Sequence, residues 1–86
     1  MPYIDSDQRS DLDKIVSLTP PDLLSGELNY LITKILMKQY NEGMSGPSYI
    51  SILKILGTLE AVKLEFYRRV AAPYEAAKCM DNGDVF

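Results

Sequence analysis

The densest group of side chains able to bind a charged or aromatic ligand lies at residues 65–75. Two adjacent arginines stand there among aromatic residues. Guanidinium groups bind phosphates and carboxylates and stack on aromatic rings, and tyrosine rings offer flat surfaces to a nucleobase. We therefore predict a binding surface with four members: Tyr67, Arg68, Arg69 and Tyr74.

A structural role competes with this interpretation. Phe66 would then be a core residue, and Glu65 would pair with an arginine three or four residues further on. Adjacent residues on a helix lie about 100° apart, so we expect Glu65 to engage one arginine and to leave the other for a partner's carboxylate or a ligand's phosphate. Pro73 follows the two arginines, and we expect the chain to change direction there and to form a concavity.

A second candidate binding segment is the glycine-rich stretch 43–48, which precedes a long apolar segment. The first turn of a helix presents free backbone amides and the positive end of the helix dipole, which favour an anion. Ser45 and Ser48 would add hydroxyl groups, so we predict both as further binding residues. An ordinary helix connector explains the same sequence, with Gly43 ending one helix in the left-handed conformation and Ser48 capping the next.

The composition argues against an enzyme. The chain contains no histidine, so it has neither a Ser-His nor a Cys-His nucleophile pair. It also lacks the glycine-rich motifs that bind dinucleotides and phosphates. Glu60 and Glu65 are five residues apart and project in different directions from one helix, which makes them a poor carboxylate pair. We expect no catalytic residue and no cofactor.

Four acidic residues near the start of the chain have a spacing that faintly resembles a calcium-binding loop: Asp5, Asp7, Asp11 and Asp13. Such a loop requires glycine at its sixth position and glutamate at its twelfth. Counted from the first aspartate, these positions hold Ser10 and Val16. We interpret the acids as the solvated start of a helix and expect no metal site.

Charge and hydropathy restrict the partners. The net charge is −3, which argues against general nucleic-acid binding because that function requires a basic surface. No apolar run approaches the ~20 residues that span a bilayer, and the N-terminus lacks the features of a signal peptide. We expect no membrane partner and a cytoplasmic location, with which the single thiol of Cys79 is compatible.

Apolar residues that recur at three- and four-residue steps predict an all-α chain. The expected elements are a short helix at 6–18, two long helices at 27–41 and 49–72, and a short helix with a tail at 73–86. Because the connector between the long helices is short, we expect them to form an antiparallel hairpin, with the N-terminal helix packed across it. At this length, residues 1–86 are expected to form a single domain.

Capping residues are expected to set the first helix boundaries. Ser6 or Ser10 is the expected cap of the N-terminal helix. The segment Thr19-Pro20-Pro21-Asp22 is expected to stop that helix, because a residue that precedes proline avoids the helical conformation. The same segment can start the second helix with its threonine as the cap, a start that Gly26 can interrupt.

The central helix, 27–41, carries two apolar stripes, and a helix of this kind needs two packing partners. A domain this small buries only ~60–65% of the surface that its unfolded chain exposes, and a single cysteine provides no intrachain disulfide. We therefore predict a homo-oligomer. Its interface is expected to include the second stripe of the central helix: Tyr30, Met37 and Tyr40.

Several segments together resemble a family of small, functionally uncharacterised proteins from phages and bacterial genomes: Gly26–Thr33, Leu59-Glu60 with Lys63–Arg69, Pro73-Tyr74-Glu75 and Asn82–Val85. The resemblance covers nearly the whole chain. The chain departs from the family pattern at Phe86, where a tyrosine is expected, and at Ala61, where a cysteine is often expected. The resemblance implies a phage or prophage product, and it transfers no activity and no catalytic residue.

Two classes of function remain open. In the first, the protein is an interaction module that blocks or bridges a host macromolecule, foremost a host protein, for example as an inhibitor of host defence. Small acidic phage proteins often inhibit or sequester host factors, which is an argument by analogy. In the second, an oligomeric ligand-binding protein sequesters a small anionic ligand such as a nucleotide signal.

Overall fold

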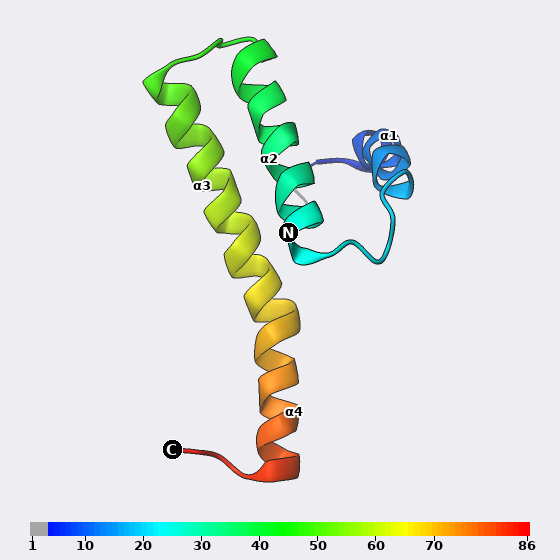
Figure 1. Ribbon diagram of the computed structural model, residues 1–86, viewed down its shortest axis with the longest axis vertical. Helices are drawn as coiled ribbons and strands as arrows, with labels where there is room; N and C mark the ends of the chain where they lie inside the picture. The colour runs from blue at the N-terminus through cyan, green and yellow to red at the C-terminus, as the bar shows by residue number, and fades with distance from the viewer. Residues whose placement is uncertain (1–3) are drawn as a thin grey trace. The chain divides into compact units, whose positions relative to one another are not determined.

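A computed structural model describes residues 4–86, and all of their regular structure is helical (Figure 1). The elements are α1 (Ser6–Ser17), α2 (Ser25–Glu42), α3 (Tyr49–Phe66), the π-helical turn η1 (Tyr67–Ala71) and α4 (Ala72–Asn82). The prediction of an all-α chain is confirmed. The chain divides into two compact units, of which one ends at Lys34 and the other begins at Ile35.

In the first unit, α1 begins with a capping box. The Asp5 carboxylate accepts a hydrogen bond from the Gln8 N–H at 3.0 Å, and the Gln8 side chain accepts one from the Asp5 N–H at 3.2 Å. The prediction of Ser6 or Ser10 as the cap is wrong, because neither serine has a glutamate or glutamine three residues later to complete such a reciprocal pair. No side chain of α1 is buried.

The segment between α1 and α2 closes the first helix and does not cap the second. The N–H and the hydroxyl of Thr19 donate to the Val16 carbonyl at 3.0 and 2.7 Å. At the start of α2, the Leu24 N–H donates to the Glu27 carboxylate at 2.9 Å. The predicted start of the second helix at Thr19 is therefore wrong. Gly26 lies inside the first turn of α2 and does not interrupt it.

In the second unit, the helix that was expected to end near residue 72 continues to Asn82. Figure 1 shows α3, η1 and α4 following one another without a change of direction at Pro73. Proline lacks an N–H, and its ring clashes with the carbonyl four residues back in an α-helix. The Ala72 N–H donates to the Tyr67 carbonyl five residues back, and this wider π turn lets the helix continue through the proline. The expected concavity at Pro73 is therefore wrong.

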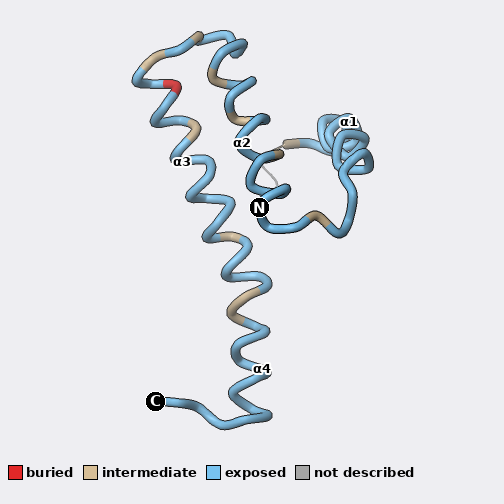
Figure 2. Tube along the Cα trace, in the orientation of Figure 1, coloured by how far each residue is buried: buried red, intermediate tan, exposed pale blue. Residues whose placement is uncertain are grey.

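Almost no side chain of the described residues is buried (Figure 2). Ser51 alone falls in the buried class, at 9% exposure, and within residues 4–86 no apolar side chain does. Phe66, the core residue of the structural interpretation, is 64% exposed. An apolar surface of this extent normally contacts other molecules.

Candidate functional site

Both arginines of the predicted binding surface pair with Glu65. Arg68 donates from Nη2 to Oε2 of Glu65, and Arg69 donates from Nε to the other carboxylate oxygen, Oε1. The expectation that Glu65 engages only one arginine is wrong. Residues three and four positions after a given residue lie on either side of it around the helix, so a carboxylate with two oxygens reaches both guanidinium groups.

These two ion pairs determine the charge of the cluster. The hydrogen bond from Arg68, followed by that from Arg69, lowers the pKa of the Glu65 carboxyl from 4.5 to about 2. The carboxylate is therefore ionised at neutral pH and balances one of the two positive charges. Both arginine side chains are 65% exposed, which leaves much of each guanidinium accessible to a partner.

The two tyrosines of the predicted surface are held by separate contacts. The Tyr67 hydroxyl donates to Oε2 of Glu75 at 3.1 Å. This hydrogen bond raises the pKa of Tyr67, because the nearby carboxylate disfavours the phenolate. The ammonium group of Lys78 lies 5.5 Å from the centroid of the Tyr74 ring, which is a cation–π contact. The structure thus brings the two arginines together at Glu65, whereas Tyr67 bonds to Glu75 and Tyr74 contacts Lys78.

Ser48 lies in the connector between α2 and α3, and it caps α3 as predicted. Its hydroxyl oxygen accepts a hydrogen bond from the Ser51 N–H at 3.1 Å. The Ser48 hydroxyl also donates to Oγ of Ser51 at 3.0 Å, and the Ser51 hydroxyl donates to the Gly46 carbonyl at 2.7 Å. A ligand at Ser48 would therefore compete with bonds that hold the start of α3.

The two glycines of the connector have different roles from the predicted ones. The positive φ, 64°, is at Gly46, and the φ of Gly43 is not positive. The prediction of a left-handed Gly43 is wrong. Its N–H donates to the Gln39 carbonyl at 3.0 Å, and a Cβ on Gly43 would lie 2.4 Å from that same oxygen. Glycine is required there by close approach of the backbone.

A cavity of about 380 Å³ lies between the connector, the end of α2 and the first turns of α3. Leu36 and Ile55 contribute to its apolar lining, and Ser45 and Lys54 contribute polar groups. A concavity of this unit thus lies at the connector, and neither arginine lines it. Lys54 was not among the residues predicted from the sequence. The available signal was that Lys54 is the first basic residue after the predicted cap, Ser48.

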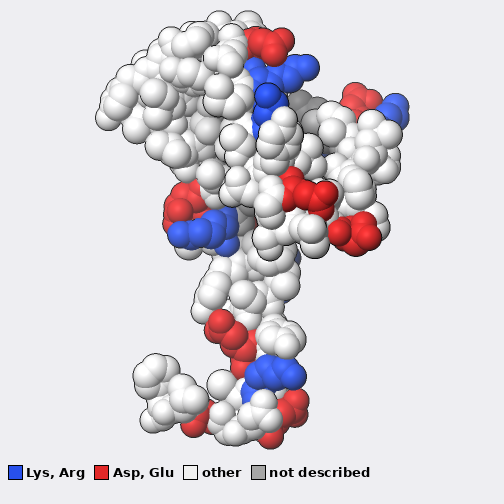
Figure 3. Space-filling model, viewed as in Figure 1, with Lys and Arg blue, Asp and Glu red and all other residues white. Residues whose placement is uncertain are grey.

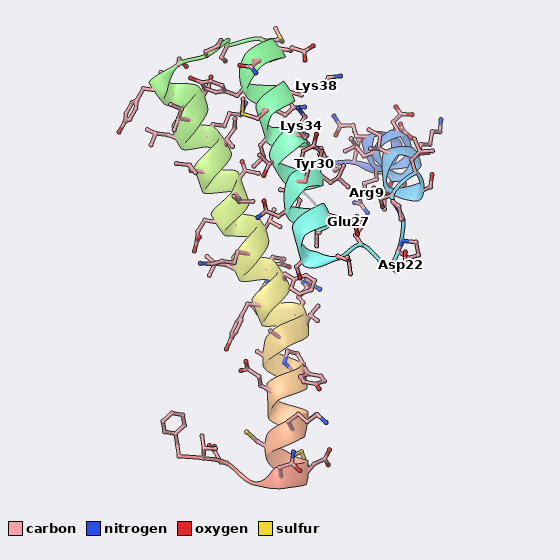
Figure 4. The ribbon with its side chains drawn as sticks, viewed as in Figure 1. Arg9, Asp22, Glu27, Tyr30, Lys34 and Lys38 are labelled. Atoms are coloured by element: carbon pink, nitrogen blue, oxygen red, sulfur yellow. The ribbon has the colours of Figure 1, made fainter. Side chains whose placement is uncertain are left out.

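The residues predicted for an oligomer interface all lie on α2. Tyr30 and Met37 are 66% and 47% exposed, and Tyr40 is half-buried. The ammonium group of Lys34 lies 5.9 Å from the centroid of the Tyr30 ring, and Figure 4 shows both side chains on the same side of α2. Their exposure is compatible with an interface, and the interface itself stays a prediction.

Charged side chains of both signs lie in a few mixed groups on the visible face, much of which carries neither sign, as Figure 3 shows. Two further ion pairs, Lys14 with Asp11 at 3.7 Å and Lys63 with Glu60 at 3.1 Å, join neighbours on single helices. The residues that the structure describes contain no group of three or more potential metal ligands. Within this same part of the chain, no helix combines the length and the hydropathy needed to cross a membrane.

These features define a small all-helical protein with an exposed arginine cluster at η1 and a cavity at the connector. The chain belongs to the family described as "Domain of unknown function (DUF6899)", which matches residues 1–85. Among curated proteins and solved structures, none matches the chain. The sequence motifs predicted that the chain belongs to an uncharacterised family, and this match confirms it.

Proposed function

We propose that this protein is a non-enzymatic binding protein that acts as a homo-oligomer and blocks or bridges a host macromolecule. The observation that supports this proposal is the absence of a buried apolar side chain within residues 4–86. Apolar side chains stabilise a fold only when they are removed from water. A chain that leaves them exposed gains stability from contact with further copies or with a partner.

In the associated state, the proposed architecture is the hairpin of α2 and α3 with α1 packed across it, as one domain. Tyr30, Met37 and Tyr40 contact another copy in this arrangement. The support is the apolar character of α2 and α3 on more than one side, together with their exposure in the single chain. Light scattering should give a mass well above 9.7 kDa at micromolar concentration, and a mass of one chain would contradict the proposal.

The proposed surface for the host partner is formed by Tyr67, Arg68, Arg69 and Tyr74. Within residues 4–86, the ion pairs of both arginines are with Glu65, a half-buried carboxylate four or fewer residues away, and the arginine ends of these pairs are exposed, where ion pairs contribute little to stability. A carboxylate or phosphate of a partner can take the place of Glu65 and bind both guanidinium groups. The two tyrosine rings are 52% and 63% exposed and add flat apolar area beside them.

The proposed context is a phage or prophage product that acts in the cytoplasm of a bacterial host, for example against a host defence protein. The support is the set of motifs, from Gly26–Thr33 to Asn82–Val85, that resemble small phage and bacterial proteins. Affinity purification from a bacterial lysate, followed by identification of bound proteins and released small molecules, tests this. A specific host protein on an otherwise empty chain supports the proposal, and a nucleotide without a host protein contradicts it.

The second candidate function is sequestration of a small anionic ligand such as a nucleotide signal. The cavity at the connector favours it, because about 380 Å³ falls within the range of small-molecule sites. Lys54 and Ser45 line the cavity beside the N-terminus of α3, which favours an anion. Calorimetric titration with nucleotides should show binding that Lys54→Met weakens, with Lys63→Met, an exposed lysine outside the cavity, as the control.

A further inference from the structure

The arginine cluster beside η1 already holds an anion that comes from its own helix. Glu65 accepts a hydrogen bond at Oε2 from Nη2 of Arg68 and another at Oε1 from Nε of Arg69. Each oxygen of one carboxylate is therefore bonded to a different arginine. Guanidinium groups recognise carboxylates through such charge-assisted hydrogen bonds. The chain itself thus shows which kind of anion fits between the two side chains.

The arginines are more accessible than the carboxylate that they bind. Both arginine side chains are 65% exposed, whereas that of Glu65 is 32% exposed. A guanidinium group has five N–H donors, and within residues 4–86 each arginine donates from one nitrogen, to Glu65. An anion from outside can therefore contact the remaining N–H groups first and then compete with Glu65 for both arginines.

The charge around the cluster fits a carboxylate better than a phosphate. Residues 60–78 contain four basic and three acidic side chains, so this segment is positive by one charge within a chain of net charge −3. One carboxylate makes the segment neutral, whereas a phosphate monoester adds about 1.5–2 negative charges and leaves it negative. Because a surplus of like charge opposes association, charge complementarity favours an acidic side chain of a partner protein.

We propose that Glu65 is an internal competitor: it occupies both arginines in the free chain, and an aspartate or glutamate of an acidic segment of the partner protein displaces it. This inference rests on the proposed function, which places the partner surface at these residues. The exchange replaces one carboxylate with another, so the arginines alone give a partner little net gain. A partner must add contacts with Tyr67 or Tyr74 to bind tightly, which makes the surface selective.

NMR of the arginine side-chain N–H groups tests the competition. The probe is a short peptide of alternating glutamate and serine, titrated into the full chain. Glu65→Gln should bind it roughly 2- to 5-fold more tightly than the wild type, because the variant removes exposed ion pairs that compete with about this strength. Circular dichroism shows whether the helices persist. If Glu65→Gln loses them, Glu65→Ala replaces it, since alanine favours the helix.

Glu60→Gln is the matched control, because it removes the same charge from the same helix. Glu60 pairs with Lys63 at 3.1 Å and lies about 12 Å along the helix from Arg68. At about 0.15 M salt, charges this far apart are largely screened, so the affinity should change by less than ~1.5-fold. Equal tightening by Glu60→Gln and Glu65→Gln would show a general effect of charge and would overturn the inference.

Two altered peptides test the chemistry of the partner. A version with glutamine in place of glutamate should leave the arginine signals of the wild type and of Glu65→Gln unchanged. A version with phosphoserine at the glutamate positions should bind more weakly than the glutamate peptide, because it adds more negative charge to an acidic chain. Tighter binding of the phosphoserine peptide would overturn the assignment of a carboxylate.

The outcomes separate this inference from the proposed function. Weaker binding by Glu65→Gln would show that Glu65 positions the arginines, and unchanged binding would show that it does not compete; either result overturns the inference. A wild-type oligomer that captures a host protein while Glu65→Gln gains no affinity for the glutamate peptide leaves the proposed function standing. A single chain that captures no host protein overturns both.

Discussion

The connector that precedes α3 and the turn that follows it hold their polar groups in opposite ways. At the connector, the side chains of Ser48 and of Ser51, in the first turn of α3, bond to backbone groups and fix the start of the helix. In and beside η1, Glu65, Tyr67 and Arg68 bond to other side chains at the surface. Side chains that satisfy backbone groups are part of the local fold, whereas exposed side-chain pairs can exchange their partners at little cost.

This difference assigns stability to one region and binding to the other. Substitutions in the connector should lower the stability of the chain, and substitutions at η1 should change what the chain binds. Substitutions in the connector that leave stability unchanged, or substitutions at η1 that lower it, would contradict this assignment.

The largest expected effect on stability is that of Gly43→Ala. A Cβ at this position would lie 2.4 Å from the Gln39 carbonyl oxygen, so the end of α2 and the connector must shift. We expect a loss of about 1–3 kcal/mol in the free energy of unfolding, measured by thermal or urea unfolding followed by circular dichroism. Gly26→Ala is the control: it meets open space within a helix and should stabilise by about 0.4–1 kcal/mol. Equal stability of the two variants would contradict the assigned role of Gly43.

The next effect in size is that of Ser51→Ala. It removes the hydroxyl that donates to the Gly46 carbonyl at 2.7 Å, and we expect a loss of about 0.5–1.5 kcal/mol in the same unfolding assay. Ser45→Ala, in the same connector, should stay within about 0.5 kcal/mol of the wild type. If Ser45→Ala costs as much as Ser51→Ala, the hydrogen bonds of Ser51 are not what fixes the connector.

A smaller effect on stability, with a large effect on function, is expected for Arg68→Ala combined with Arg69→Ala. Within residues 4–86 both arginines form their ion pairs with Glu65, and both are 65% exposed, so the melting temperature should change by no more than about 2 °C. Binding of the partner or ligand should be abolished in a pull-down or calorimetric titration. Lys63→Ala, which breaks a similar pair with Glu60, should leave binding intact. Loss of the oligomer or of the fold in the double variant would show that the arginines are structural.

The sequence was sufficient to predict the helices and one of their caps. Spacing of apolar residues indicated an all-α chain, and Ser48 could be identified as a cap because it directly precedes a long apolar segment. The choice among neighbouring capping residues was less well determined. Asp5 replaced the predicted serines because the cap depends on a second residue, Gln8, three positions further on.

The remaining errors concern geometry that residue types do not specify. Gly43 and Gly46 are both plausible sites of positive φ, and only the fold of the connector selects Gly46. Pro73 is normally a helix breaker, but a π turn before it lets the helix continue. The two arginines share Glu65 despite the angle of about 100° between them, because they lie on either side of one carboxylate with two oxygens.

The smallest expected effect is the pH dependence contributed by Glu65. Its pKa is about 2 in the folded chain, against an ordinary value of 4.5, chiefly because of the hydrogen bond from Arg68 and then that from Arg69. A carboxyl whose folded pKa is depressed contributes stability that is fully present above its ordinary pKa and is lost as the pH falls through the folded value. The contribution should therefore disappear between about pH 4.5 and about pH 2.

Titration of the Glu65 side-chain carboxyl by NMR measures this directly. The wild-type midpoint should lie near pH 2, and the variant lacking both arginines should titrate close to the ordinary value of 4.5. Glu65→Gln should melt at a slightly lower temperature than the wild type at neutral pH, and this difference should nearly vanish at pH 2. A wild-type midpoint near 4.5 would show that the arginines do not pair with Glu65 in solution. A partner could then bind the arginine cluster without displacing Glu65.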